Sequence, residues 1–126
     1  MEMLFQAHSG LRYLVLLAGV VAVVAFVAGA LSRRPYDRPG RILTAVFLAT
    51  LDLQVLIGLV LFIGGRRPTG IHLHMTLMVL AAVMGHVGSV VAKRRAVPGH
   101  ALPLAGTLAA LALIVVGILS IRDSVF

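Results

Sequence analysis

The chain has 126 residues, of which 60% are hydrophobic and 12% are charged, and its formal net charge is +7. Soluble domains carry charge on about a quarter of their residues, so this composition excludes an ordinary soluble protein. The chain has no cysteine, which excludes disulfides and covalent c-type haem attachment.

Four long apolar segments occupy most of the chain, at roughly 8–31, 42–64, 71–93 and 101–121. Each is close to the length of about 20 residues that a helix needs to cross a bilayer core. None shows the alternation of apolar and polar residues that is typical of strands. An acidic rather than a basic stretch precedes the first segment, so we do not expect it to be a cleaved signal peptide. The sequence predicts an all-α fold: a single integral membrane domain, 1–126, with four transmembrane helices.

The three connections are short and rich in turn formers, which predicts an up-down-up-down four-helix bundle. The first and third connections hold more Lys and Arg than the second connection and the C-terminal tail, so we expect both termini to be extracytoplasmic. Basic loops of this kind meet anionic membrane lipids, and we expect no nucleic-acid partner. The basic residues of the first and third connections are Arg33, Arg34, Arg38, Arg41, Lys93, Arg94 and Arg95.

Ionisable residues inside the apolar segments are costly at membrane depth, so each is a functional candidate. In the predicted topology, His8 of the first segment and His74 of the third lie at similar depth near the outer surface. Two histidines on different helices at one depth are the arrangement that ligates a haem iron from both sides. Each ligand imidazole is then expected to donate its second N–H to a backbone carbonyl or a polar side chain. Arg12, one turn inward of His8, suits a haem propionate. Alternatively, His8 lies in the headgroup layer and Arg12 snorkels outward.

His72 competes with His74 for the ligand role, because the two are separated by about 200° around a helix and only one can face a given neighbour. We favour His74 and expect His72 to be interfacial. A structural zinc site is disfavoured, since it usually needs four nitrogen or sulfur ligands and the chain offers no thiolate.

His86 lies deeper, about 18 Å along the helix axis from His74. Asp52 of the second segment is at a matching height, so we predict that the two side chains touch directly or through one water and that the His86 imidazole is buried. Such a contact is either a proton relay or a structural clasp between helices. A second haem at His86 would need another axial ligand, and His100 lies too near the loop to supply it.

Three stretches, "HSGLRYLVLL", "LDLQVLIGLVLF" and "HMTLMVLAAVMGHVG", resemble small bacterial four-helix membrane proteins of cytochrome b type. The resemblance implies b-type haem binding and electron transfer in a bacterial cytoplasmic (inner) membrane, with pattern histidines at His8, His74 and His86. The chain departs from the pattern at Asp52, where many relatives have histidine, and at Leu73, where many have an acidic residue.

The leading functional prediction is a haem b protein, with one haem most favoured, that exchanges electrons with quinone or with a larger respiratory or photosynthetic complex. We expect an electron-transfer protein or subunit rather than a stand-alone enzyme. Its metal ligands are predicted to be His8 and His74, and its wider cofactor site to include Arg12, Asp52 and His86. The alternative is a non-redox accessory subunit that packs against a larger membrane complex. A homodimer, and a small transporter with Asp52 and His86 as its proton path, are further alternatives.

Overall fold

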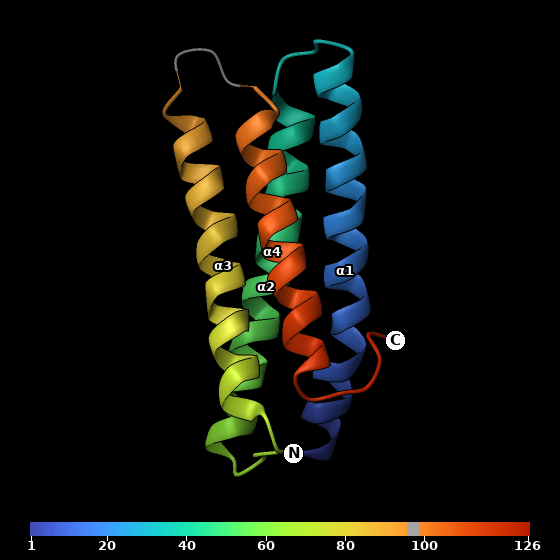
Figure 1. The fold of residues 1–126 in the computed structure, drawn as a ribbon, viewed down its shortest axis with the longest axis vertical. Helices are drawn as coiled ribbons and strands as arrows, with labels where there is room; N and C mark the ends of the chain where they lie inside the picture. The colour runs from blue at the N-terminus through green and yellow to red at the C-terminus, as the bar shows by residue number, and fades with distance from the viewer. Residues whose placement is uncertain (96–98) are drawn as a thin grey trace.

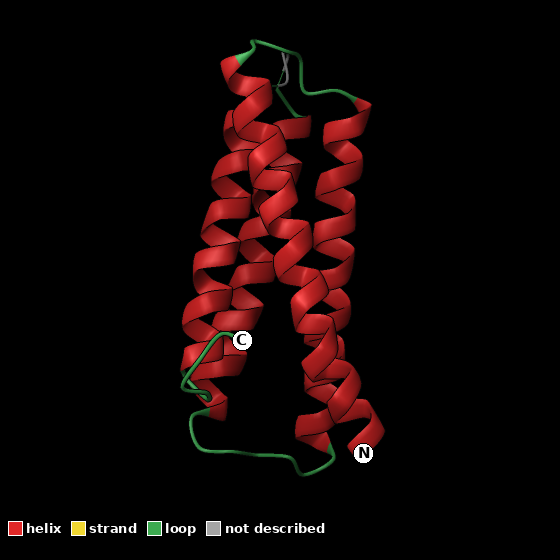
Figure 2. Cartoon of the chain, turned by 90° about the vertical axis from the view of Figure 1, so that its right-hand side faces the viewer, coloured by secondary structure: helices red, strands yellow, loops and turns green. Residues whose placement is uncertain are grey.

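The computed structural model describes residues 1–95 and 99–126, and these form a bundle of four long helices (Figure 1). No strand occurs among the described residues, and the connections lie at the two ends of the bundle (Figure 2). The predicted all-α fold is thereby confirmed. The helices are α1 (Glu2–Leu31), α2 (Arg38–Ile63), α3 (Ile71–Lys93) and α4 (Ala101–Leu119).

The first helix begins at Glu2, earlier than the predicted start at residue 8. Its first turn is stabilised by a hydrogen bond from Gln6 Nε2 to Glu2 Oε1 at 2.9 Å, and the Glu2 charge is favourable at a helix N-terminus. His8 therefore lies within a helix that extends beyond it by more than one turn, rather than at a helix end.

The other helix ends follow local backbone chemistry. The second helix begins at Arg38 rather than 42, because Pro39 in the first turn has the fixed φ of a helix and needs no partner for its missing N–H. Gly65 and Gly70 both have positive φ, and they turn the chain between α2 and α3. The fourth helix ends at Leu119, two residues before the predicted boundary.

Successive helices run antiparallel, as the short connections predict (Figure 1). One end of the bundle holds the N-terminus, the α2–α3 connection and the end of α4; we call it the N-terminal end. After α4 the tail crosses towards α1, where the ring of Phe126 stacks on that of Tyr13 with centroids 6.1 Å apart. The tail therefore contributes side chains to the N-terminal end of the bundle.

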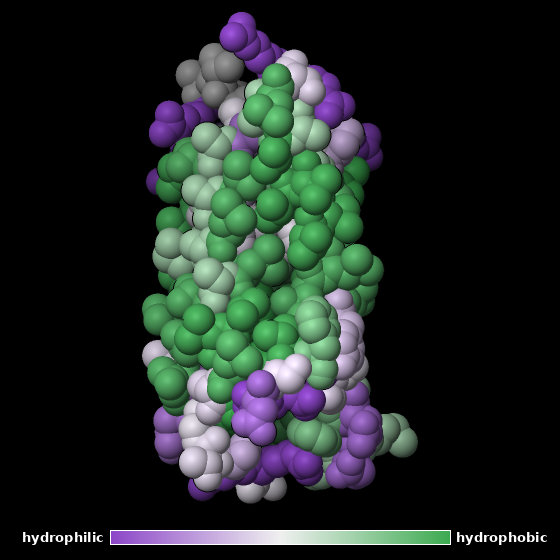
Figure 3. Space-filling view, turned by 45° about the vertical axis from the view of Figure 1, so that its right-hand side comes forward, coloured by the Kyte–Doolittle hydropathy of each residue, from purple (hydrophilic) through white to green (hydrophobic). Residues whose placement is uncertain are grey.

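The face of the bundle shown in Figure 3 is apolar along most of its length and polar at both ends. All four helices are long and apolar enough to cross a membrane. Large aliphatic side chains such as Leu17, Val24 and Leu56 are more than half exposed. An apolar surface of this kind is stable in contact with lipid.

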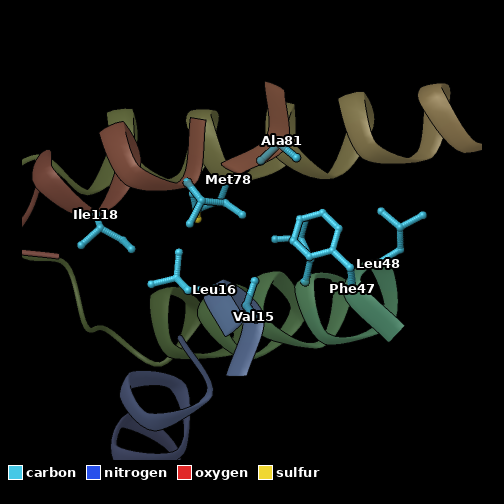
Figure 4. Packing of buried hydrophobic residues seen from close by; sticks show 10 residues of the cluster. Val15, Leu16, Phe47, Leu48, Met78, Ala81 and Ile118 are labelled. Carbon is cyan, nitrogen blue, oxygen red and sulfur yellow. The ribbon is translucent and has the colours of Figure 1, made fainter. Parts of the chain in front are cut away.

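The core of the bundle is a cluster of side chains from all four helices, several of which are shown in Figure 4. Val15, Phe47, Leu51 and Ala81 have almost no exposed surface. The most extensive contact between two helices is that of α3 with α4. Small residues allow helix backbones to approach in membranes, where packing rather than the hydrophobic effect holds helices together. The cluster joins all four helices in the interior of the bundle.

Candidate functional site

A cavity of about 400 Å³ lies at the N-terminal end of the bundle. Its volume falls within the range of about 300–1,000 Å³ that is typical of small-ligand sites. A smaller adjoining cavity of about 140 Å³ is also lined by both His8 and His74. The structure therefore brings together the two histidines that the sequence predicts as a pair. The larger cavity is lined by Phe5, His8, Ser9, Arg12, Val15, Leu51, Gln54, Arg66, Arg67, Pro68, His74, Met78, Ile114, Ile118, Ile121 and Arg122.

His74 is buried and is held in one orientation by the end of α4. Its Nδ1 lies 2.8 Å from the backbone oxygen of Gly117. This carbonyl belongs to the last turn of α4, where helix carbonyls lack their usual partners, and Ser120 Oγ also donates to it at 2.6 Å. A carbonyl can only accept, so Nδ1 carries the proton and the neutral ring has its lone pair on Nε2. His74 Nε2 has no hydrogen-bond partner among the described residues, which leaves it free to ligate a metal in the cavity.

His8 is held from the side of α2. Gln54 Nε2 donates to the His8 backbone oxygen at 2.8 Å, and the imidazole packs against Gly58. A Cβ on Gly58 would lie 3.1 Å from His8 Cε1, so only glycine leaves the ring in its present place. The sequence predicts that each ligand imidazole donates its second N–H, and this is wrong for His8, whose Nδ1 is buried without a partner among the described residues. His8 Nε2 has no partner there either, but unlike Nδ1 it retains accessible surface.

Arg12 is 8% exposed, so it does not snorkel out of the bundle. Its guanidinium donates to Tyr13 Oη at 2.9 Å and to Ser9 Oγ at 3.4 Å, and both partners are neutral. Its Nε is buried without a partner, and no carboxylate pairs with Arg12 among the described residues. A buried cation without a counter-charge is costly, and an anionic ligand in the cavity would remove that cost.

Three further arginines line the cavity, and no pattern in the sequence assigned them to the site. Arg66 and Arg67 come from the α2–α3 connection and Arg122 from the tail. No acidic residue lines the cavity, although Glu2 lies 3.7 Å from Arg66 in an exposed pair, a type that contributes little. Only the predicted topology pointed to these arginines, because it places the second connection and the tail at the same end of the bundle as His8 and His74. The cavity is therefore positively charged and suits an anionic ligand.

The three histidines outside the pair do not line the cavity. His72 is exposed, and its ring packs edge-on against that of Phe62 with centroids 5.8 Å apart. His100 lies at the opposite end of the bundle, where its ring packs against Phe26, Tyr36 and the backbone at Gly29.

Asp52 and His86 touch directly, as predicted from their matched depth. His86 Nε2 lies 2.8 Å from Asp52 Oδ2 and 3.0 Å from Oδ1. The expectation that the imidazole is buried is wrong, since the two side chains are 51% and 47% exposed. His86 is about 120° around α3 from His74, so it cannot share the buried face. The pair does not line the His8–His74 cavity.

The described residues contain no group of three or more His, Cys, Asp or Glu side chains placed to hold a metal ion. A haem iron takes only its axial ligands from the protein, so a pair of histidines is sufficient for it. Comparison of the chain with known protein families, curated proteins and solved structures gives no match. The chemistry of the cavity therefore has to be inferred from its own residues.

Proposed function

We propose that the cavity at the N-terminal end binds one b-type haem, with His8 and His74 as axial ligands, and that the protein transfers electrons in the membrane. The observation that carries this proposal is the joint lining of one cavity by two histidines, each with Nε2 free, and by a buried arginine without a carboxylate partner. Haem b supplies a reversible one-electron change at its iron. Bis-histidine ligation fills both axial positions, which favours electron transfer over oxygen binding.

The residues of the cavity fit the parts of this cofactor. The hydrogen bond from His74 Nδ1 to the Gly117 carbonyl fixes the ring and makes Nε2 a better ligand. Arg12 and the three further arginines of the cavity are opposite in charge to the two propionates and can donate to their oxygens. Val15, Met78 and Ile114 give the apolar wall that a porphyrin ring needs and keep water from the iron.

The Gly58→Leu variant tests this assignment through packing alone. The new side chain has to displace the His8 ring, because a Cβ there already lies 3.1 Å from Cε1. Overpacking of this kind costs about 1–3 kcal/mol, so we expect haem affinity to fall by about tenfold or more in a titration of detergent-solubilised protein followed at the Soret band.

Gly10→Leu is the matched control, because a Cβ at Gly10 meets no atom within 4 Å on the same helix as His8. It should bind haem like the unchanged chain. Equal affinity in Gly58→Leu and Gly10→Leu would contradict ligation by His8.

We further propose that the four helices cross a bacterial cytoplasmic membrane with the N-terminal end outside. Seven Lys or Arg residues lie in or beside the connections of the opposite end, against Arg66, Arg67 and Arg122 at the N-terminal end. An excess of basic residues marks the cytoplasmic side.

The chain has no cysteine, so single cysteines report this topology cleanly. Ser32→Cys and Ser124→Cys place the same exposed side chain at the two ends. We expect a membrane-impermeant maleimide to label intact spheroplasts at position 124, and position 32 only after permeabilisation. Labelling of position 32 alone in intact spheroplasts would reverse the orientation.

A further inference from the structure

The Asp52–His86 pair lies in a groove between α2 and α3, in the half of the bundle away from the His8–His74 cavity. The groove has a volume of about 730 Å³. Basic residues of the helix ends line it at one side, and Arg41 is about 16 Å along α2 from Asp52. Leu48, Ala49 and Val90 give it apolar walls. The groove thus joins a basic, water-facing end to a polar pair at membrane depth.

The polar atoms inside the groove have unused hydrogen-bonding capacity. Both oxygens of Asp52 lie within 3.0 Å of His86 Nε2, which leaves His86 Nδ1 without a partner among the described residues. Ser89, one turn from His86 towards the basic end, is a buried polar residue that also lines the groove. Half-exposed polar groups at this depth are costly against lipid tails. A ligand that carries hydrogen-bonding oxygens on an apolar body would remove this cost.

We propose that this groove binds the headgroup of a lipid-soluble quinone. The carboxylate of Asp52 accepts the Nε2 proton, so His86 Nδ1 is an acceptor when the ring is neutral and a donor when it is protonated. It can therefore bond to the hydroxyl of a quinol and to the carbonyl of a quinone. The flat ring fits between the apolar walls, and the tail leaves through the open side of the groove into lipid. This inference rests on the proposed function and names its redox partner.

An anionic phospholipid fits the same groove less well. Its phosphate would pair with Arg38, Arg41 and Lys93 at the basic end, and the Asp52 carboxylate would repel it from the inner end. Acyl chains would then cover His86 Nδ1 without offering it a partner, and the cost of burying that atom would remain. The Asp52–His86 pair thus favours a quinone ring over a charged phospholipid headgroup.

The test is photolabelling of the full chain in nanodiscs of zwitterionic phospholipid with an azido-substituted benzoquinone that carries a decyl chain, followed by peptide mapping. We expect label on the α2 and α3 segments of the groove, and unlabelled decyl-quinone should compete it away. His86→Leu should reduce the competed label by about tenfold, the loss expected for a hydrogen bond to a group that can be charged. Label spread over all four helices, or label that does not respond to competitor, would overturn the proposal.

Two alanine substitutions separate the groove from the lipid surface in general. Ala49→Phe fills the groove and should abolish competed labelling, whereas Ala112→Phe adds the same ring to an exposed position of α4 outside it and should not. Equal labelling of the two variants would contradict the site. The site would also be contradicted if anionic phospholipid or a second copy of the chain occupied the groove and quinone did not compete with it.

The His74→Ala variant distinguishes a failure here from a failure of the haem proposal. It lacks a proposed haem ligand but leaves the groove intact, so quinone labelling should persist in it. A colourless protein that still labels at the groove would refute haem binding alone. A haem protein without competed label would refute the quinone site alone.

Discussion

We expect His8→Ala and His74→Ala each to abolish stoichiometric haem in purified protein, because each removes one of the two proposed axial ligands. His72→Ala is the matched control, since His72 lies two residues from His74 on the same helix and packs against Phe62 outside the cavity. The measurement is haem content per chain, together with the low-spin spectrum, after expression with ample haem supply.

His8→Ala and His74→Ala differ in their expected effect on stability, so the loss of a ligand can be distinguished from the loss of the fold. His74→Ala also removes a donor to the Gly117 carbonyl, and a lost hydrogen bond of this kind costs about 1–3 kcal/mol of stability. The His8 side chain makes no hydrogen bond among the described residues, so His8→Ala has no such cost. Loss of haem in His8→Ala with unchanged helical content would therefore identify a ligand. Full haem and an unchanged spectrum in both variants would show that the assignment is wrong.

The second large effect that we expect is a loss of stability when the contact between α3 and α4 is disrupted. A Cβ on Gly106 would lie 3.2 Å from the Cα of Gly88 and 3.3 Å from the Met84 carbonyl oxygen, so the obstacle is backbone that cannot rotate away. Gly106→Leu should therefore push the helices apart and cost about 3 kcal/mol or more, at the upper end of overpacking effects. The measurement is unfolding in detergent, followed by circular dichroism.

Gly10→Leu is again the control, because the same substitution in α1 meets no neighbour. Leucine has a higher helix propensity than glycine, so this variant should be as stable as the unchanged chain or slightly more stable. Equal loss of stability in Gly106→Leu and Gly10→Leu would show that helix contact is not the cause.

The features that could be predicted from the sequence are those that follow from the regular repeat of a helix. Long apolar segments predicted four helices. The spacing of His8 and Arg12 by one turn placed both side chains on one face of the first helix, and in the structure that face lines the cavity. The depth of Asp52 and His86 likewise predicted their contact. Depth follows from counting residues along a helix, which requires no knowledge of the neighbours.

The parts of the site that sequence reasoning missed depend on how segments meet in space. Arg66 and Arg122 enter the cavity because the α2–α3 connection and the tail fold over it, and neither shows a periodic pattern. The Gly117 carbonyl that orients His74 is a backbone group, so no side-chain motif marks it. The half-exposed position of His86 follows from its angle around α3, about 120° from His74, and depth along the helix does not contain that angle.

The central claim, one bis-histidine haem b between α1 and α3, is tested most directly by the reduced-minus-oxidised spectrum of the detergent-purified chain, with haem quantified per mole of protein. We predict b-type bands, a low-spin spectrum in both oxidation states and one haem per chain. A colourless protein purified from cells with ample haem supply, or a high-spin spectrum with an open axial position, would contradict the claim.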